Sequence, residues 1–182
     1  MDSIRNGAFG LTNTNRLVRF YQGATGLKTG STAKAKFCVS ATAKRGNMHL
    51  ICVVMGAPSS DVRNSIATQL LNWGFANFEL YENPSEQLNN LKVKGGVQNE
   101  CNIMSLPFAH IVNKGEAGKV EKKYVVDGYV SAPLIKGDVI GHIEYSINGK
   151  VIGRSDIVST VNVEKIDFWH LFVRILSIFL IK

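Results

Sequence analysis

The stretch Gly26-Leu27-Lys28-Thr29-Gly30-Ser31-Thr32 decides how the N-terminal part of this 182-residue chain folds. Two further strand-like runs, residues 36–43 and 48–55, follow it, and turn-forming residues such as Gly46 separate the runs. This alternation predicts three neighbouring antiparallel strands. From one such strand, Lys28 and Thr29 can direct a cation and a hydroxyl into a cleft, while Gly30 lets a ligand approach the backbone.

A helix over residues 60–78 is predicted to cover this sheet. Pro58-Ser59-Ser60-Asp61 provides helix-start chemistry. A stripe at helical spacing follows, in which only the last residue is polar: Val62, Ile66, Leu70, Trp73 and Asn77. We expect this stripe to pack on the sheet.

The remaining sequence predicts a second, all-β part. Asn83-Pro84-Ser85 breaks the helical pattern and marks a domain boundary. Short strand-like runs and Gly turns over residues 88–163 predict a small β-sandwich of roughly 75 residues. Asn148-Gly149, between two alternating runs, is a strong hairpin signal.

Several other segments, taken together with the stretch around Lys28, carry a family resemblance. In chain order they are Asn13-Thr14-Asn15-Arg16-Leu17, residues 21–30, Ser40-Ala41-Thr42-Ala43, Val53-Val54-Met55-Gly56, Gly95-Gly96, residues 132–141 and a terminal helix with Phe168-Trp169. Together they resemble the serine-type D-alanyl-D-alanine carboxypeptidases of peptidase family S11, which are low-molecular-mass penicillin-binding proteins. The resemblance covers nearly the whole chain in the right order.

The resemblance implies an α+β fold in three parts. Residues 1–82 would be the C-terminal portion of a β-lactamase/transpeptidase-like catalytic domain, with part of its antiparallel sheet and one helix. Residues 83–164 would form a small all-β sandwich, and residues 165–182 an amphipathic membrane-anchoring helix.

The resemblance also implies an activity and a binding site. An intact enzyme of this family trims the terminal D-alanine from peptidoglycan stem peptides through an acyl-enzyme, and it binds β-lactams. Lys28 would then place positive charge near the terminal carboxylate of the substrate, and Thr29 would hydrogen-bond that carboxylate. Gly30 would keep the strand surface open, and the backbone N–H of Ser31 would donate to the oxyanion.

Such enzymes also need a Ser-x-x-Lys pair and a Ser-x-Asn element before the Lys-Thr-Gly strand. Only 27 residues precede Lys28. Ser31-Thr32-Ala33-Lys34 fits the first string but lacks helical context, and the hairpin turn explains Ser146-Ile147-Asn148. We therefore expect a truncated chain that contains no catalytic residue, since nucleophile and general base are both absent, and that is inactive alone.

The net charge and the Cys, His and Glu residues indicate which binding partners and metals to expect. The net charge of +7 indicates an acidic partner such as anionic lipid or cell-wall polymer, and the scattered basic residues do not favour nucleic acid. Three cysteines lack metal-type spacing and are interpreted as small apolar residues: Cys38, Cys52 and Cys101. Three further residues are interpreted as structural rather than metal-binding: His110, His142 and Glu144. We expect no metal and no cofactor.

Residues 166–182 are predicted to form a helix with a narrow polar side. The apolar run is shorter than the ~20 residues that a membrane span needs, so we favour a helix lying in the plane of the membrane surface. The predicted anchor consists of Phe168, Trp169, Leu171, Phe172, Arg174, Ile175, Leu176, Ile178 and Phe179. Trp169 would lie near the headgroups, and Arg174 and Lys182 would be attracted to anionic lipid. The alternative is a core helix that closes the sandwich.

The N-terminal residues lack the apolar core of a signal peptide. The resemblance places the intact enzyme at the outer face of the bacterial cytoplasmic membrane, so the missing leader agrees with truncation. An alternative function from another class is a non-catalytic, membrane-associated β module that binds or positions cell-wall partners.

Overall fold

The computed structural model describes residues 2–4, 9–11 and 13–180, with side-chain burial for residues 13–176. The chain divides into two compact units. The first contains Met1–Leu80 and Val112–Gly115, and the second contains Tyr81–Ile111 and Glu116–Lys182. Near the N-terminus, β1 (Asp2–Ile4) and β2 (Phe9–Leu11) pair antiparallel.

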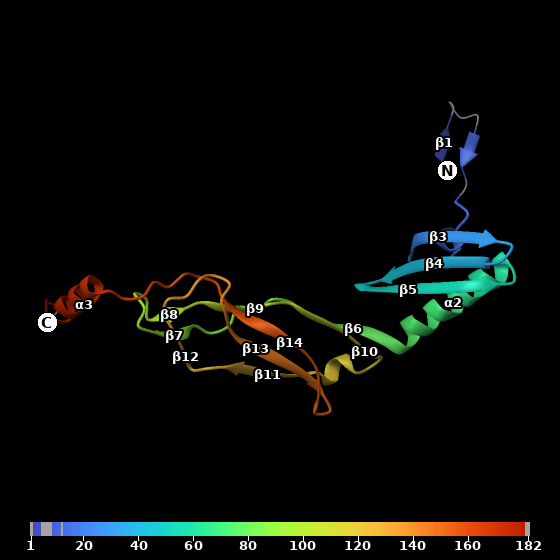
Figure 1. Cartoon of the computed structure of the whole chain (residues 1–182). Coiled ribbons are helices and arrows are strands. Elements are labelled where there is room, and N and C mark those ends of the chain that lie inside the picture. Colours follow the sequence, from blue (N-terminus) through green and yellow to red (C-terminus); the bar gives the residue numbers. More distant parts are fainter. Residues whose placement is uncertain (1, 5–8, 12, 181–182) are drawn as a thin grey trace. The chain divides into compact units, whose positions relative to one another are not determined.

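The first unit is built on an antiparallel sheet of order β3-β4-β5, whose strands lie side by side in Figure 1. The strands are β3 (Ala24–Thr32), β4 (Lys36–Arg45) and β5 (Met48–Ala57), which confirms the three predicted strands. Arg45 pairs with Met48, so Gly46, with a φ of 58°, and Asn47 form the turn between β4 and β5. Lys34 lies in the turn after β3, which confirms that Ser31 and Lys34 share no helix.

Helix α2 (Ser60–Asn77) begins as the sequence predicts but buries a different face. The Ser59 hydroxyl accepts a hydrogen bond from the Val62 N–H at 3.2 Å, which caps the helix. The predicted stripe of Val62, Ile66, Leu70 and Trp73 is 36–59% exposed, so the expectation that it packs on the sheet is wrong. The buried residues are Arg63, Ala67, Leu71 and Gly74.

Close approach of helix and sheet explains this choice of face. A Cβ atom added to Gly74 would lie 2.6 Å from Cδ1 of Leu50 on β5. Small residues at 67 and 74 therefore let the helix backbone come near the strands, and the larger side chains of the stripe are left on a flank. The core of this unit also includes Leu17 of the short helix α1 (Leu17–Phe20), which lies beside β3.

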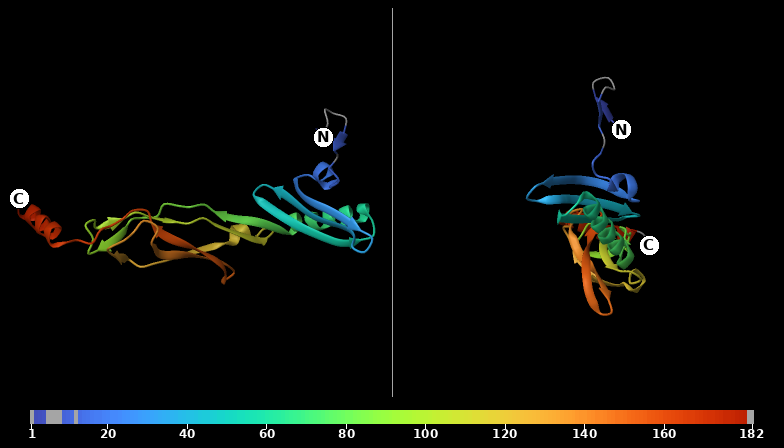
Figure 2. Two further views of the ribbon diagram at one scale, coloured as in Figure 1. Left: turned by 45° about the horizontal axis from the view of Figure 1, so that its top comes forward. Right: turned by 90° about the vertical axis from the view of Figure 1, so that its right-hand side faces the viewer.

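In its described residues, the second unit is all-β apart from one 3₁₀ turn, η1 (Ala117–Lys119), and the C-terminal helix. One sheet has the order β11-β13-β14-β9, formed by β11 (Glu121–Val126), β13 (Val139–Ile147), β14 (Lys150–Ser159) and β9 (Ile103–Ser105). A second has the order β12-β7-β8, formed by β12 (Tyr129–Ser131), β7 (Leu91–Lys94) and β8 (Glu100–Cys101). A further pair consists of β6 (Phe78–Asn83) and β10 (Phe108–Asn113), and each of these strands has residues in both units. Figure 2 shows these strands from two more directions.

The core of the second unit is centred on Tyr145. The ring of Phe108 stacks on the Tyr145 ring with centroids 4.0 Å apart. The Tyr145 hydroxyl accepts a hydrogen bond from Nδ2 of Asn83 at 3.0 Å and lies 3.1 Å from the hydroxyl of Ser155. A fully buried phenol therefore has partners on two strands, which satisfies its polar atom. The predicted hairpin is confirmed, because Asn148 and Gly149 have φ angles of 50° and 78° between β13 and β14.

The C-terminal helix α3 (Phe168–Leu180) exposes its apolar side chains. The described ones, from Phe168 to Leu176, are 40–78% exposed, which contradicts the alternative of a core helix closing the sandwich. Arg174 donates hydrogen bonds to Oδ1 of Asn99 at 2.7 Å and to the carbonyl of Val97 at 3.4 Å. The side chains of Ile178 and Phe179 lie outside the described residues. Among the helices described, none is both long and apolar enough to cross a bilayer.

Candidate functional site

The Lys-Thr-Gly residues lie on β3, an edge strand of the first unit's sheet. Lys28 is exposed, and its Nζ donates a hydrogen bond to the carbonyl of Thr29 at 2.6 Å. Thr29 is 8% exposed, and its hydroxyl lies 3.0 Å from the hydroxyl of Thr14. The strand therefore carries an exposed cation next to a buried hydroxyl that is linked to the preceding loop.

Gly30 and Ser31 lie on an open part of the same strand. A Cβ atom built on Gly30 would meet no atom within 4 Å, so the backbone here is accessible to a ligand. Ser31 is exposed and lines a pocket of about 580 Å³ with Thr32, Ala33, Lys36, Phe37 and Pro58.

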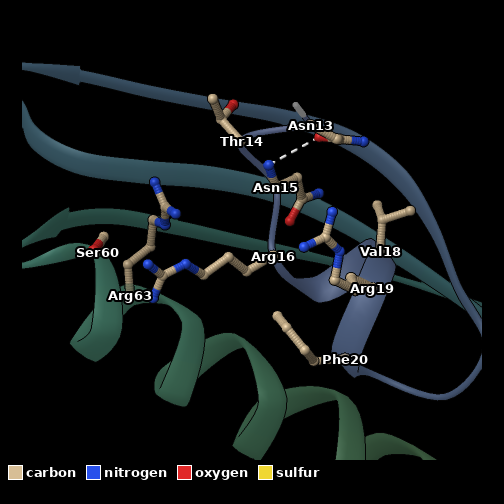
Figure 3. A pocket seen from close by; sticks show the side chains of 9 residues that line it. All are labelled: Asn13, Thr14, Asn15, Arg16, Val18, Arg19, Phe20, Ser60 and Arg63. Atoms are coloured by element: carbon tan, nitrogen blue, oxygen red, sulfur yellow. Dashed lines mark hydrogen bonds between the residues drawn. The ribbon is translucent and has the colours of Figure 1, made fainter. Parts of the chain in front are cut away.

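A second pocket, of about 880 Å³, lies between the loop before α1 and the N-terminus of α2. Its lining residues are Asn13, Thr14, Asn15, Arg16, Val18, Arg19, Phe20, Ser60 and Arg63. Figure 3 shows Arg16 extending from the loop toward α2, which carries Ser60 and Arg63. Thr14 links this pocket to the Lys-Thr-Gly strand through its contact with Thr29. Arg16 is paired with Asp61 at 3.1 Å, so Arg19, Arg63 and the helix N-terminus are the features of this pocket that favour an anion.

Arg63 is the buried cation of this pocket. It is only 5% exposed, and its guanidinium donates to Oδ1 of Asn64 at 3.1 and 3.2 Å and to the carbonyl of Cys38 at 3.5 Å. In the described part of the chain, no ion pair includes Arg63. A buried guanidinium held only by neutral acceptors retains a charge that an anionic ligand can neutralise.

Asn15 adds a buried donor to the same pocket. Its Oδ1 accepts a hydrogen bond from the Leu17 N–H at 3.2 Å, and the residue is 3% exposed. Its Nδ2 is the one buried side-chain polar atom in the described residues that lacks a hydrogen-bond partner. An orphaned amide donor at this position can be satisfied by a ligand oxygen.

Sequence reasoning missed the roles of Arg63 and Asn15. Asn15 lies in the Asn13–Leu17 segment, which was noted only for its family pattern. Arg63 was not singled out in the sequence, because arginine is seldom fully buried. Its position four residues before Ala67 is the signal that places it on the buried face.

Histidine, cysteine and carboxylate side chains are the residue types that most often bind metal ions in proteins. Among the residues that the structure describes, no three of His, Cys, Asp and Glu come together to hold a metal ion. The three cysteines are free, with Cys52 and Cys101 buried and Cys38 half-buried. Burial raises the pKa of the Cys52 and Cys101 thiols.

The fold is that of a penicillin-binding protein of the carboxypeptidase class. Residues 2–59 match a family described as D-alanyl-D-alanine carboxypeptidase, and residues 75–165 match the C-terminal domain of penicillin-binding protein 5. The chain therefore belongs to the D-alanyl-D-alanine carboxypeptidases of the penicillin-binding protein 5 type, which confirms the resemblance and the fold class predicted from the sequence.

Individual members of this family are similar to the chain in sequence and structure. The chain is 36% identical over 165 residues to D-alanyl-D-alanine carboxypeptidase DacF of Bacillus subtilis, covering 88% of this chain and 42% of the relative. It is 36% identical to DacA of Haemophilus influenzae over 72% of this chain and 35% of the relative. The crystal structure of penicillin binding protein 5 from Haemophilus influenzae superposes with a TM-score of 0.71 at 32% identity, over 82% of this chain and 45% of that one. The chain thus spans less than half the length of these relatives.

Proposed function

We propose that this chain supplies the substrate-binding wall of a serine-type D-alanyl-D-alanine carboxypeptidase that acts on peptidoglycan stem peptides. The observation that carries the proposal is the Lys-Thr-Gly edge strand, with Lys28 exposed and the backbone at Gly30 open. The nucleophilic serine and its base come from a polypeptide segment that these 182 residues do not include.

In this reaction, the serine oxygen attacks the carbonyl of the penultimate D-alanine, and the C–N bond to the terminal D-alanine breaks. The leaving amine takes a proton, and water then hydrolyses the acyl-enzyme and restores the serine. Ser31 contributes a backbone N–H to the developing oxyanion, and one such donor is worth about 100-fold to 1,000-fold in rate.

Lys28 and Thr29 hold the terminal carboxylate of the substrate. The Lys28 ammonium gives up its bond to the Thr29 carbonyl, because a carboxylate is the stronger acceptor. The Thr29 hydroxyl carries one proton and two lone pairs, so it can accept from Thr14 and still donate to the ligand.

Arg63 and Asn15 form the second anion-binding part of this site. Arg63 is buried without an acidic partner in the described residues, and the amide Nδ2 of Asn15, which lines the same pocket, is unsatisfied. Both groups favour a bound carboxylate, and the N-terminus of α2 adds its positive potential.

A fluorescent β-lactam tests the carboxypeptidase proposal. The chain would be mixed with the segment of a Bacillus subtilis relative that it does not match, and acyl-enzyme formation would be followed on a gel. We expect the added segment to be labelled only when this chain is also present. Lys28→Ala should abolish the labelling. Lys44→Ala is the control, because Lys44 is an exposed lysine of the same sheet, and it should leave the labelling unchanged. Labelling of this chain alone would contradict the proposal, because it would make Ser31 a nucleophile.

We also propose that α3 anchors the chain in the plane of a membrane surface. Its described apolar side chains are 40–78% exposed, more than water-facing helices normally leave uncovered. Liposome flotation tests this with Phe172→Asp and the control Val151→Asp, because both side chains are 44% exposed. Flotation should fall only for Phe172→Asp, and equal flotation of the two variants would refute the anchor.

A non-catalytic module that positions cell-wall partners is the second candidate function. The match to the C-terminal domain of penicillin-binding protein 5 over residues 75–165 and the exposed α3 support it, since neither depends on the nucleophile. This alternative would be favoured if the chain floats with liposomes but no β-lactam labelling occurs when the missing segment of a relative is added.

A further inference from the structure

Residues 163–166, which lead into α3, are paired with the rest of the second unit on both sides. Val163 forms a β-bridge with Leu134, and Lys165 forms one with Gly96. These pairings hold the segment between two stretches of the unit that are distant in sequence. The segment is therefore a short strand-like connection and does not behave as a flexible linker.

Little chain separates this connection from the helix. The Ile166 N–H donates a hydrogen bond to the Gly95 carbonyl at 2.8 Å, and α3 begins at Phe168. Asp167 between them caps the helix, since its Oδ1 accepts a hydrogen bond from the His170 N–H at 2.8 Å. The start of α3 is therefore fixed close to a backbone hydrogen bond of the second unit.

Gly96 allows the connection to lie this close. A Cβ atom at position 96 would be 2.7 Å from Cγ1 of Val163 and 2.9 Å from Cγ1 of Val93. Gly96 is buried, so the contact has room only because the residue has no side chain. The Gly95-Gly96 pair, which the sequence singles out without a role, thus forms the base on which α3 stands.

Arg174 fixes the direction of the helix from this base. It is half-buried, and its Nη2 donates hydrogen bonds to Oδ1 of Asn99 at 2.7 Å and to the carbonyl of Val97 at 3.4 Å. Hydrogen bonds from an ionised donor are stronger than those between neutral groups. Because the chain is already held at residues 163–166, this second contact within α3 restrains the helix from swinging.

The aromatic side chains of α3 lie on the other side of the helix. At about 100° per residue, Phe168, Trp169 and Phe172 are about 120–160° around the helix axis from Arg174. The three rings gather together, because the centroids of Phe168 and Trp169 lie 6.3 and 5.7 Å from that of Phe172. They are 44–78% exposed. The contact through Arg174 therefore leaves the aromatic side free to enter a bilayer surface.

We propose that Arg174 is a positioning residue that docks α3 on residues 95–99. The anchor and the second unit then meet the membrane as one rigid body, with the aromatic side of α3 toward the lipid. This inference rests on the proposed membrane anchor. It assigns Arg174 to a contact within the protein, whereas the sequence favours attraction to anionic lipid. Such docking sets the orientation of the second unit on the bilayer.

Spin-label distances test the docking on the full chain. Labels at Val139→Cys and Ile175→Cys, two exposed sites of the second unit, would report the distance from the sheet to α3 in a Cys38→Ser background. We expect one narrow distribution, in solution and on vesicles of phosphatidylethanolamine and anionic phosphatidylglycerol. Arg174→Ala and Asn99→Ala should each broaden it about twofold or more. The double variant should be no broader than Arg174→Ala, because both changes remove the same bond.

Arg154→Ala is the matched control, because it removes a surface arginine of the same unit that is paired with Glu144, and it should leave the distribution narrow. Flotation on the anionic vesicles should be equal for the wild-type and Arg174→Ala chains, since the aromatic side binds the lipid. A broad distribution in the wild-type chain, or a narrow one with Arg174→Ala, would overturn the proposal. A fall in flotation with Arg174→Ala would assign this residue to the lipid and overturn it as well. The anchor can fail separately, because a wild-type chain that does not float but keeps an Arg174-dependent narrow distribution in solution would reject the anchor alone.

Discussion

Two adjacent leucines of α2 test which face of the helix is buried. Leu71 is 1% exposed and packs in the core with Ala67, and Leu70 is 46% exposed on the flank. Truncating a fully buried leucine to alanine costs about 2–5 kcal/mol through lost transfer energy and the cavity left behind. The same truncation at a half-exposed site costs less than about 1 kcal/mol, and helix propensity changes little in either case.

Urea unfolding followed by tryptophan fluorescence measures the difference. Trp73 reports on α2 when Trp169 is replaced by phenylalanine. With a urea m-value of about 1–3 kcal/mol per molar, Leu71→Ala should lower the midpoint by about 1 M or more. Leu70→Ala should shift it by well under half as much. Equal shifts, or a larger one for Leu70→Ala, would refute the assignment of the buried face.

Two more predictions concern the second unit. Gly153→Ala should destabilise it by about 1–3 kcal/mol in a urea titration, because the new Cβ would lie 2.6 Å from the Phe108 ring. Gly118→Ala, with no atom within 4 Å of the new Cβ, is the control, and equal effects would contradict the packing described. The hydrogen bond from Tyr124 to Glu86, 2.6 Å long, raises the pKa of Tyr124 to about 12 and is the main cause that lowers the pKa of Glu86. Stability from this bond should therefore be lost between pH 10 and 12 and again as pH falls through the lowered pKa of Glu86. Tyr124→Phe should move the Glu86 pKa, measured by NMR titration, back toward its ordinary value, and an unchanged pKa would refute the contribution of the bond.

Local turn chemistry made much of the fold predictable from the sequence. Asn148-Gly149 adopts the positive φ angles that a two-residue hairpin turn requires, and Ser59 caps α2 as its hydroxyl predicts. These features depend on a few neighbouring residues. The three strands around Lys28 followed in the same way from alternation and turns.

The buried face of α2 was not predictable from hydrophobicity. The periodic stripe of Val62, Ile66, Leu70 and Trp73 is the more apolar side, but Gly74 allows a closer approach to Leu50 than those side chains would. Helix-to-sheet distance is a property of the packed structure. The same holds for Arg63, whose burial beside the Cys38 carbonyl depends on the face that α2 buries.

The candidate site was predictable only in part. The order of the segments around Lys-Thr-Gly identified the strand, since the motif and its neighbours are contiguous in sequence. The pocket of Asn15 and Arg63 joins residues 48 positions apart, so its assembly depended on the tertiary structure. The division into compact units also assigns Val112–Gly115 to the first unit, a long-range pairing that no local pattern indicates.

The most direct test of the central claim is β-lactam acylation under complementation, measured as a rate. With the unmatched segment of a relative in excess, the wild-type chain should support covalent labelling, and Lys28→Ala should slow it at least tenfold while Lys44→Ala leaves the rate unchanged. Equal acylation rates for the two variants would mean that the β3 lysine does not form part of the substrate-binding wall.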